Sequence, residues 1–322
     1  MPSNQTPLGA LPARFRRPRV LIAGCGDVGL RLAHALPAGV RVLALTSSPQ
    51  RAPELREQGI TPLQGDLDAP RTIARLAGLA HRVVHLVPPS AEAEGQWWRD
   101  LRTQALLRAL RLRTPPEVLV YASTSGVYGD CAGALVSEVR AVAPRTPRAQ
   151  RRVDAERQVR FFGRAPGTRS SILRIPGIYA PDRPGGTPRE RLARGTPVLV
   201  PEDDVYTNHI HADDLARAVV AALYLGRPNR AYNVSDDSEM KMGAWFDAIA
   251  DAFHLPRPPR VSWEEAERNI APILLSFMSE SRRLSNRRMK RELRLVLHHP
   301  TLAATLAEAA PRTLRKQLAL PI

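Results

Sequence analysis

Three closely spaced glycines near the start of the chain have the pattern of a phosphate-binding loop. They follow a short apolar run, Val20–Ala23, and precede a segment with helical character, Leu30–Leu36. In a strand–turn–helix unit, the pattern G-x-G-x-x-G allows a tight turn, close approach of a pyrophosphate and close packing of the helix on the strand. The free N–H groups and positive dipole end of that helix attract phosphate. An ordinary glycine-rich turn is the alternative. The predicted dinucleotide-binding residues are Gly24, Gly26, Asp27, Val28 and Gly29.

The residues that follow the second predicted strand indicate which dinucleotide is bound. An NAD-binding unit usually carries an Asp or Glu about 20 residues after the glycine loop, where it holds the ribose 2′-OH. Thr46 and Ser47 occupy that position here, and Arg51 follows soon after. Loss of the carboxylate and gain of a guanidinium suit a 2′-phosphate, so NADP(H) is favoured, with NAD(H) as the alternative. In the simpler interpretation, Arg51 is a solvated helix residue.

The ends of the third and fourth predicted strands supply the remaining candidate cofactor contacts. Asp66 and Leu67 close the third strand, where the adenine would lie. The Asp66 carboxylate either accepts a hydrogen bond from adenine or caps the next helix. Leu86 and Val87 close the fourth strand and would border the middle of the cofactor. We expect His85, just before them, to be packed rather than catalytic.

These residues need a scaffold, and the hydrophobic pattern predicts one. Strands and helices alternate with short turns, which indicates an α/β fold with a doubly wound, parallel Rossmann sheet and a smaller, mostly helical C-terminal lobe. We expect a disordered leader at 1–17, a cofactor-binding domain at 18–175 plus 206–235, and a substrate-binding lobe at 176–205 plus 236–322. A long helix is predicted over Gln96–Leu112. Tyr206–His211 and Ala231–Val234 are expected to return to the main sheet, and Arg282–Leu293 to form a helix of the lobe.

Composition limits the classes of function. The chain has 322 residues and a formal net charge of +16, but its cations are almost all arginines spread along the chain. Aromatic residues make up 5% and do not interleave with basic runs, which disfavours a nucleic-acid partner. Cys25 and Cys131 form no C-x-x-C pair, which argues against a disulfide framework and fits the cytoplasm. No apolar run approaches the roughly 18 residues of a membrane span, so no membrane partner is expected.

Three further motifs carry a family resemblance. Tyr121–Gly129 reads Y-A-S-T-S-G-V-Y-G, Leu173–Tyr179 reads L-R-I-P-G-I-Y, and Asn208–Ala216 reads N-H-I-H-A-D-D-L-A. With the glycine loop and Gly65–Leu67, these stretches resemble the extended short-chain dehydrogenase/reductase family, the NAD(P)-dependent sugar epimerases and dehydratases. The loop departs from the family's usual G-x-x-G-x-x-G and is closer to an atypical subgroup. The resemblance covers most of the chain and implies a small-molecule substrate, often a nucleotide-linked sugar.

The catalytic motif of that family is incomplete in this chain. The family uses a Tyr as general base, a Lys four residues later and an upstream Ser or Thr. The resemblance makes Thr124 the upstream hydroxyl, whereas Arg148 and Arg152 stand at the Tyr and Lys positions. Arg152 keeps a cation that would bind the nicotinamide ribose, but a guanidinium does not lose its proton near neutral pH. Tyr128 is the nearest phenol that could act instead, and Asp154 is a weaker candidate.

A basic run near the C-terminus is the candidate substrate site. Arg282, Arg283 and Arg287 would suit the diphosphate of a nucleotide-linked sugar. A solvated basic helix face is the alternative interpretation. Phe277, just before this run, is expected to belong to the core.

Histidines and carboxylates alternate at His209, His211 and Asp213, the spacing of metal ligands on one face of a strand. The family resemblance gives a different interpretation, in which a strand ends here and Asp213 caps a helix. We therefore predict no metal site.

Two functional hypotheses follow from the sequence. The first is an NADP(H)-dependent oxidoreductase or epimerase that transfers hydride to or from a sugar-like or nucleotide-sugar substrate. The second is a catalytically silent NADP(H)-binding protein that reports the cofactor state to a partner. Arg148, at the position of the Tyr general base, separates the two. The enzyme is the leading hypothesis. We expect the protein in the cytoplasm, with a homodimer as one possible assembly.

Overall fold

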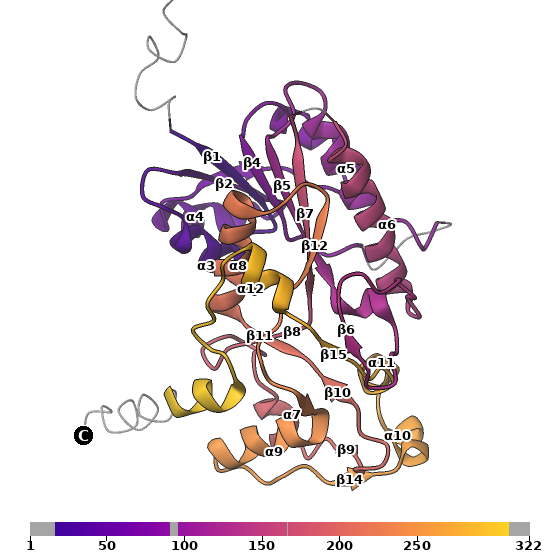
Figure 1. Ribbon diagram of the computed structural model, residues 1–322. Helices are drawn as coiled ribbons and strands as arrows, with labels where there is room; N and C mark the ends of the chain where they lie inside the picture. The colour runs from indigo at the N-terminus through magenta and orange to yellow at the C-terminus, as the bar shows by residue number, and fades with distance from the viewer. Residues whose placement is uncertain (1–16, 91–95, 166, 309–322) are drawn as a thin grey trace, which may run out of the picture.

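The computed structural model describes residues 17–90, 96–165 and 167–308 of the chain. Its centre is a parallel sheet in the order β12-β7-β5-β4-β1-β2-β3 (Figure 1). The strands are β1 Arg19–Ala23, β2 Arg41–Thr46, β3 Thr61–Gln64, β4 Arg82–His85, β5 Val118–Thr124, β7 Arg169–Ile175 and β12 Arg230–Asn233. Because β1 pairs with β2 on one side and β4 on the other, the strand order reverses beside the glycine loop. In parallel sheets, ligands bind in the crevice at this point. The predicted doubly wound fold is confirmed.

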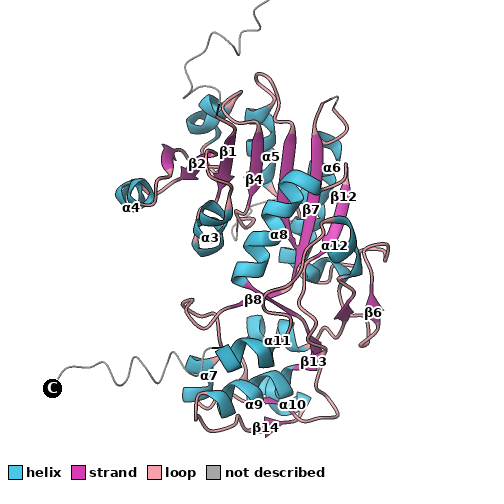
Figure 2. Ribbon diagram, turned by 60° about the vertical axis from the view of Figure 1, so that its left-hand side comes forward, coloured by secondary structure: helices cyan, strands magenta, loops and turns pink. Residues whose placement is uncertain are grey.

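Helices cover both faces of the sheet (Figure 2). On one face lie α3 Asp27–Ala35, α8 Ala212–Leu225 and the short α12 Arg287–Glu292; on the other lie α5 Leu101–Leu110 and α6 Pro147–Phe162. Shorter helical segments follow the strands: η1 Pro49–Arg51 and α4 Ala52–Glu57 after β2, η2 Pro70–Leu76 after β3, and η3 Ser125–Tyr128 after β5.

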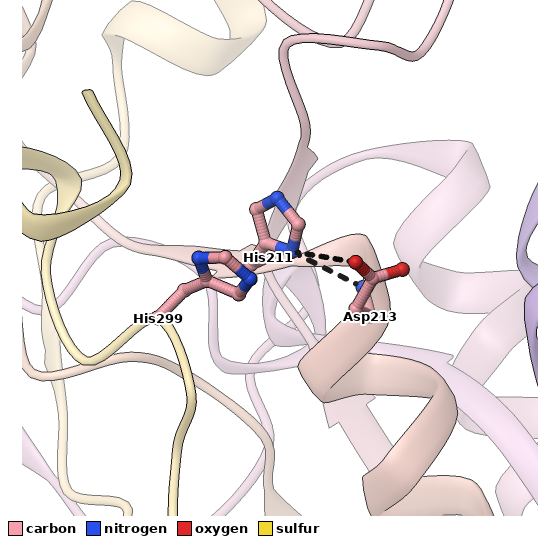
Figure 3. A group of neighbouring side chains, drawn as sticks. All are labelled: His211, Asp213 and His299. Carbon is pink, nitrogen blue, oxygen red and sulfur yellow. Dashed lines mark hydrogen bonds and ion pairs between the residues drawn. The ribbon is translucent and has the colours of Figure 1, made fainter. Parts of the chain in front are cut away.

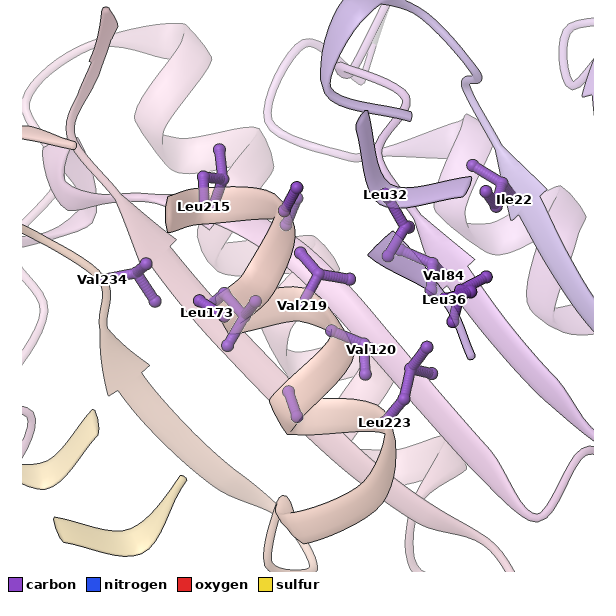
Figure 4. Packing of buried hydrophobic residues seen from close by; sticks show 14 of the residues in the cluster. Ile22, Leu32, Leu36, Val84, Val120, Leu173, Leu215, Val219, Leu223 and Val234 are labelled. Carbon is purple, nitrogen blue, oxygen red and sulfur yellow. The ribbon is translucent and has the colours of Figure 1, made fainter. Parts of the chain in front are cut away.

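Alternating side chains of the strands feed two hydrophobic cores, one on each face. Ile22 packs toward α3, whereas its neighbour Leu21 packs toward α5 on the opposite face. Figure 4 shows how Val219 and Leu223 of α8 meet Val120 of the sheet. These residues are almost completely buried. The two cores hold the carboxyl ends of the strands in fixed positions.

The helix predicted over Gln96–Leu112 is shorter in the structure and begins at Leu101. The helix starts there because the buried Asp100 side chain accepts a hydrogen bond from the Thr103 N–H, which makes Asp100 the N-cap.

The lobe below the sheet contains several helices (Figure 1). They include α7 Arg189–Ala193, α9 Met242–Ala252, α10 Trp263–Asn269 and α11 Pro272–Met278. Pairs of very short strands join them: β8 Gly177–Tyr179 with β11 His209–His211, β10 Tyr206–Thr207 with β13 Met240–Lys241, β9 Val198–Leu199 with β14 Arg260–Val261, and β6 Leu135–Val136 with β15 Arg283–Leu284.

Two segment predictions are wrong. Tyr206–His211 does not return to the main sheet, because β10 and β11 pair with β13 and β8 instead. The helix predicted over Arg282–Leu293 is a short strand followed by α12, whose Met289 is fully buried in the main core. Ala231–Val234 does enter the main sheet, as β12. The leader predicted at 1–17 lies outside the described residues except for its last one. Within the described part of the chain, every helix is too short or too polar to cross a membrane.

Candidate active site

Of the three glycines in the loop, one has free space where a Cβ would lie, and the other two are tightly packed there. Gly24 has a φ of +88°, and a Cβ there would lie 2.9 Å from the Val87 backbone N. A Cβ on Gly29 would approach the Gly24 carbonyl oxygen to 3.1 Å, so the first turn of α3 packs closely on the loop. A Cβ on Gly26 would meet no atom within 4 Å. The open space over Gly26, at the N-terminus of α3, fits a pyrophosphate.

Asp27 begins α3, and its side chain is held by two arginines. Its carboxylate lies 3.1 Å from Arg31 Nε and 3.2 Å from Arg183 Nε. Arg31 also pairs with Asp182 and Asp213. The loop that carries Asp182 and Arg183 is therefore fixed beside the glycine loop. Val28, the next predicted contact, packs partly buried against the main core.

The end of β2 presents hydroxyls and a guanidinium. Arg51 Nη1 donates to the Cys25 carbonyl at 2.8 Å, which places Arg51 at the edge of the glycine loop. Ser47 is exposed, whereas the Thr46 hydroxyl is bonded to the backbone of Ser48. Burial raises the pKa of the Cys25 thiol to about 11, so Cys25 stays uncharged.

Several residues predicted to lie on the adenine side of the site already have partners within the protein. Asp66 Oδ1 accepts from the Asp68 N–H at 2.9 Å, as a turn cap would. Leu67 is buried, and Val87 contacts the space beside Gly24. His85 is fully buried, and its Nε2 forms a hydrogen bond with Thr103 Oγ1 at 2.9 Å. Burial lowers the pKa of His85 to about 3.

Leu86, the remaining predicted cofactor contact, is partly buried. Its N–H donates to the carbonyl of Ala23, which ends β1, at 2.8 Å. Leu86 therefore borders the glycine loop.

A cleft of about 590 Å³ lies between the main sheet and the lobe. Thr124, at the end of β5, lines it, and its hydroxyl accepts from the Gly126 N–H at 3.3 Å. Arg152 lines the same wall and donates to the Ala122 carbonyl at 2.7 Å and the Tyr121 hydroxyl at 3.1 Å. The cleft thus collects residues that lie far apart in the sequence.

Two cleft arginines lie over aromatic rings. The Arg148 guanidinium lies 4.6 Å from the Phe277 ring centre, and the Arg191 guanidinium lies 4.8 Å from that of Phe246. Burial and the nearby Arg152 charge lower the pKa of Arg148. Neither Arg148 nor Arg191 has an ion pair within the described part of the chain. The cleft therefore offers cations to an anionic ligand.

The prediction that Tyr128 acts as the catalytic phenol is wrong. Its side chain is buried away from the cleft, where the hydroxyl donates to Asn233 Oδ1 at 2.7 Å and accepts from Arg174 at 2.9 Å. Burial raises the pKa of this phenol. Arg174 also forms a buried, two-pronged ion pair with Glu156. Tyr128 therefore belongs to a structural network.

Of the three arginines predicted to bind substrate, only Arg282 lines the cleft. Arg283 pairs with Glu239 and packs on the Tyr206 ring outside it. Arg287 is exposed at the start of α12, beside the main sheet. The prediction is wrong for Arg283 and Arg287, because Arg283 is directed toward Glu239 and Arg287 belongs to α12, and neither lines the cleft.

Figure 3 shows His211, Asp213 and His299, whose ligand atoms all lie within 4.8 Å of one another. The two imidazoles are stacked, with ring centres 3.7 Å apart, so their in-plane lone pairs do not converge on one point. The Asp213 carboxylate already forms an ion pair with Arg31. His211 Nδ1 accepts a hydrogen bond from the Asp213 N–H at 3.3 Å. We interpret this cluster as the anchor of the α8 N-terminus.

The model of the NAD dependent epimerase/dehydratase family matches residues 20–235. The chain belongs to this family. The UDP-glucose 4-epimerase of Azospirillum brasilense is 27% identical over 243 residues, which cover 65% of this chain and 70% of that protein. A functionally unknown conserved protein of Silicibacter pomeroyi is 27% identical in its solved structure, with a TM-score of 0.71 and coverage of 92% and 99%. The structure of MoeE5 with UDP-glucose and NAD shares the fold, at 22% identity, a TM-score of 0.71 and coverage of 93% and 99%.

Family membership confirms three predictions from the sequence: the resemblance, an enzyme of the NAD(P)-dependent epimerase/dehydratase type, and a nicotinamide cofactor. Arg148 and Arg152, one helical turn apart on α6, both line the cleft. Their assignment to the Tyr and Lys positions of the family motif stays a prediction.

Sequence reasoning missed several cleft residues. Phe277 was expected in the core but is 45% exposed and lines the cleft. Arg191 and Glu280 carry no motif of their own; only their nearness to basic runs could have drawn attention to them. His209 stacks on Trp245 in the cleft wall, with ring centres 3.4 Å apart.

Proposed function

We propose that this protein is an NADP(H)-dependent oxidoreductase or epimerase that acts on a nucleotide-linked sugar in the cleft. The observation that carries the proposal is the composition of the cleft wall. Thr124 and Arg152 lie on the side of the main sheet, and Arg191 and Arg282 lie on the side of the lobe. One wall would hold the reacting sugar and the other its diphosphate.

The cofactor would bind along the glycine loop, with its pyrophosphate over Gly26 and the N-terminus of α3. When bound, the nicotinamide supplies the acceptor or donor of hydride. Arg51 favours NADP(H), because its guanidinium is held at the loop edge beside the exposed Ser47, and β2 ends without a carboxylate. A 2′-phosphate between them would replace the hydrogen bond of a ribose hydroxyl to a carboxylate.

In this proposal the residues of the cleft have separate tasks. The Thr124 hydroxyl would hydrogen-bond the reacting oxygen, and Arg152 would position the nicotinamide ribose. Arg282, held by Glu280 and the Gly129 carbonyl, would contact the diphosphate. We assign 18–175 plus 206–235 to cofactor binding and 176–205 plus 236–322 to substrate binding. The exceptions are β10, which pairs with β13 of the lobe, and α12, which packs on the main core.

The test is isotope exchange between labelled NADPH and a panel of nucleotide sugars that includes UDP-glucose. We expect exchange in the wild-type protein and its suppression in Thr124→Ala. Arg51→Ala should weaken NADPH binding about 10- to 100-fold with little change for NADH, since a hydrogen bond to a charged group contributes about 1.5–3 kcal/mol. Arg56→Ala, which removes an exposed arginine from the adjoining helix α4, is the matched control. NADPH binding without exchange would support the catalytically silent alternative.

A further inference from the structure

One carboxylate faces the arginines of the cleft. Glu280 is the sole Asp or Glu among the described residues that line it. Its side chain is 9% exposed, so it forms part of the wall rather than a solvated rim. A buried carboxylate at a ligand site is expected to have a specific partner or a specific task.

The segment that carries Glu280 is fixed against the turn that follows Thr124. The Ser281 N–H donates to Asp130 Oδ1 at 2.9 Å, and the Ser281 carbonyl accepts from the N–H groups of Cys131 and Gly133 at 3.0 Å. These bonds hold Glu280 beside the turn that follows Thr124, in the wall of the cleft. A group held in this way needs little reorganisation to act.

The two oxygens of Glu280 are in different states. Oε2 lies 2.8 Å from Arg282 Nη1, and the same nitrogen donates to the Gly129 carbonyl at 2.9 Å. Oε1 is buried and has no hydrogen-bond partner. The charge of Glu280 acts on Arg148, which stands at the family's Tyr position. One oxygen is therefore anchored, whereas the other is buried in the cleft wall without a hydrogen-bond partner.

The other titratable groups near the reacting end fit proton transfer poorly. Tyr128 is buried in a structural network. His209 is stacked on Trp245, and burial with the Arg191 charge lowers its pKa to about 3. Tyr206 lines the cleft, but its ring packs under Arg283.

Resting on the function proposed above, we propose that Glu280 is the general base of this enzyme and replaces the missing Tyr from the opposite wall of the cleft. The O–H bond of the reacting sugar hydroxyl breaks and its proton passes to Glu280 Oε1. The C–H bond at the carbon that carries this hydroxyl breaks as well. Its hydride would pass to the oxidised nicotinamide, and a C=O bond would form at that carbon. In the reverse step, Glu280 returns the proton.

Glu280→Gln tests the proposal, because it keeps the shape and an oxygen acceptor for Arg282 but removes the base. We expect the wild-type exchange rate to fall toward acidic pH as the acceptor becomes protonated. In Glu280→Gln, kcat should fall at least about 100-fold and the acidic limb should disappear. Glu239→Gln is the matched control, since Glu239 pairs with the neighbouring Arg283 outside the cleft. It should leave both quantities unchanged.

A binding measurement checks the same residue without turnover. The affinities for UDP-glucose and UDP are measured calorimetrically between pH 5 and pH 8 on the NADPH-saturated protein, which has no oxidised nicotinamide to accept a hydride. The preference for UDP-glucose over UDP should weaken at low pH in the wild type and be small and independent of pH in Glu280→Gln.

Unchanged kcat and pH profile in Glu280→Gln would overturn the proposal, as would loss of the acidic limb in Tyr206→Phe alone. An unchanged ligand preference in Glu280→Gln would count against it equally. Failure of the proposed function would look different. The wild-type protein itself would then show no exchange with any nucleotide sugar, and that result would remove both proposals.

Discussion

Gly26→Val separates dinucleotide binding from folding in this protein. Gly26 has φ −81° and ψ −155°, an extended conformation that any residue adopts, and its Cβ position is open. Its role as N-cap of α3 involves no side-chain hydrogen bond. The substitution should therefore cost about 1 kcal/mol or less in the absence of ligand. The added side chain would instead occupy the space over the α3 N-terminus, where we place the pyrophosphate.

The magnitude follows from the linkage of binding to unfolding. NADPH at 100 times its Kd stabilises the folded state by about 2.7 kcal/mol. At about 2–4 °C per kcal/mol for a domain of this order of size, the wild-type Tm should rise by about 5–10 °C. The rise should be absent in Gly26→Val. Thermal unfolding with and without NADPH, followed by circular dichroism, measures both quantities.

Gly24→Ala is the informative control. Gly24 has a φ of +88°, and a Cβ there would lie 2.9 Å from both the backbone N and Cγ2 of Val87. The left-handed conformation alone costs about 1–2 kcal/mol for a residue with a Cβ. This variant should therefore unfold at a lower temperature even without ligand. A full NADPH-induced rise in the Tm of Gly26→Val would refute the placement of the pyrophosphate. A severe loss of stability in Gly26→Val without ligand would show that the space at the Gly26 Cβ is not open.

Two further predictions concern buried charges outside the cleft. Glu156→Gln leaves the Arg174 guanidinium, whose side chain is 5% exposed, without its counter-ion, so chemical denaturation should show a loss of about 3–5 kcal/mol. No loss would mean that Arg174 finds another acceptor. Burial raises the pKa of Asp236 to about 7, so folding favours its protonated form. This contribution is fully present below about pH 4, the unfolded pKa, and is lost as pH rises through 7. Asp236→Asn should therefore remove part of the fall in stability between pH 4 and 7, and an unchanged pH dependence in that variant would contradict the prediction.

Local patterns in the sequence determined the fold class and the cofactor loop. A short apolar run, three spaced glycines and a helix have few arrangements open to them, because the turn and the helix N-terminus depend only on neighbouring residues. The family motif in the sequence pointed to Thr124 as a hydroxyl of the site, and Thr124 ends β5 and does line the cleft. The roles of Thr124 and of the cofactor contacts stay predictions.

Only the tertiary structure decided which side chains share the cleft. Tyr128 lies four residues after Thr124, yet the turn between them directs its phenol into the core, whereas Glu280 comes from far along the chain and reaches the cleft. Arg282 and Arg283 are neighbours in sequence, but β15 places them on different sides. The glycine spacing fixes a local backbone conformation, which the sequence carries by itself. The cleft depends on hydrogen bonds between segments about 150 residues apart, and these form only once both segments are packed on the sheet.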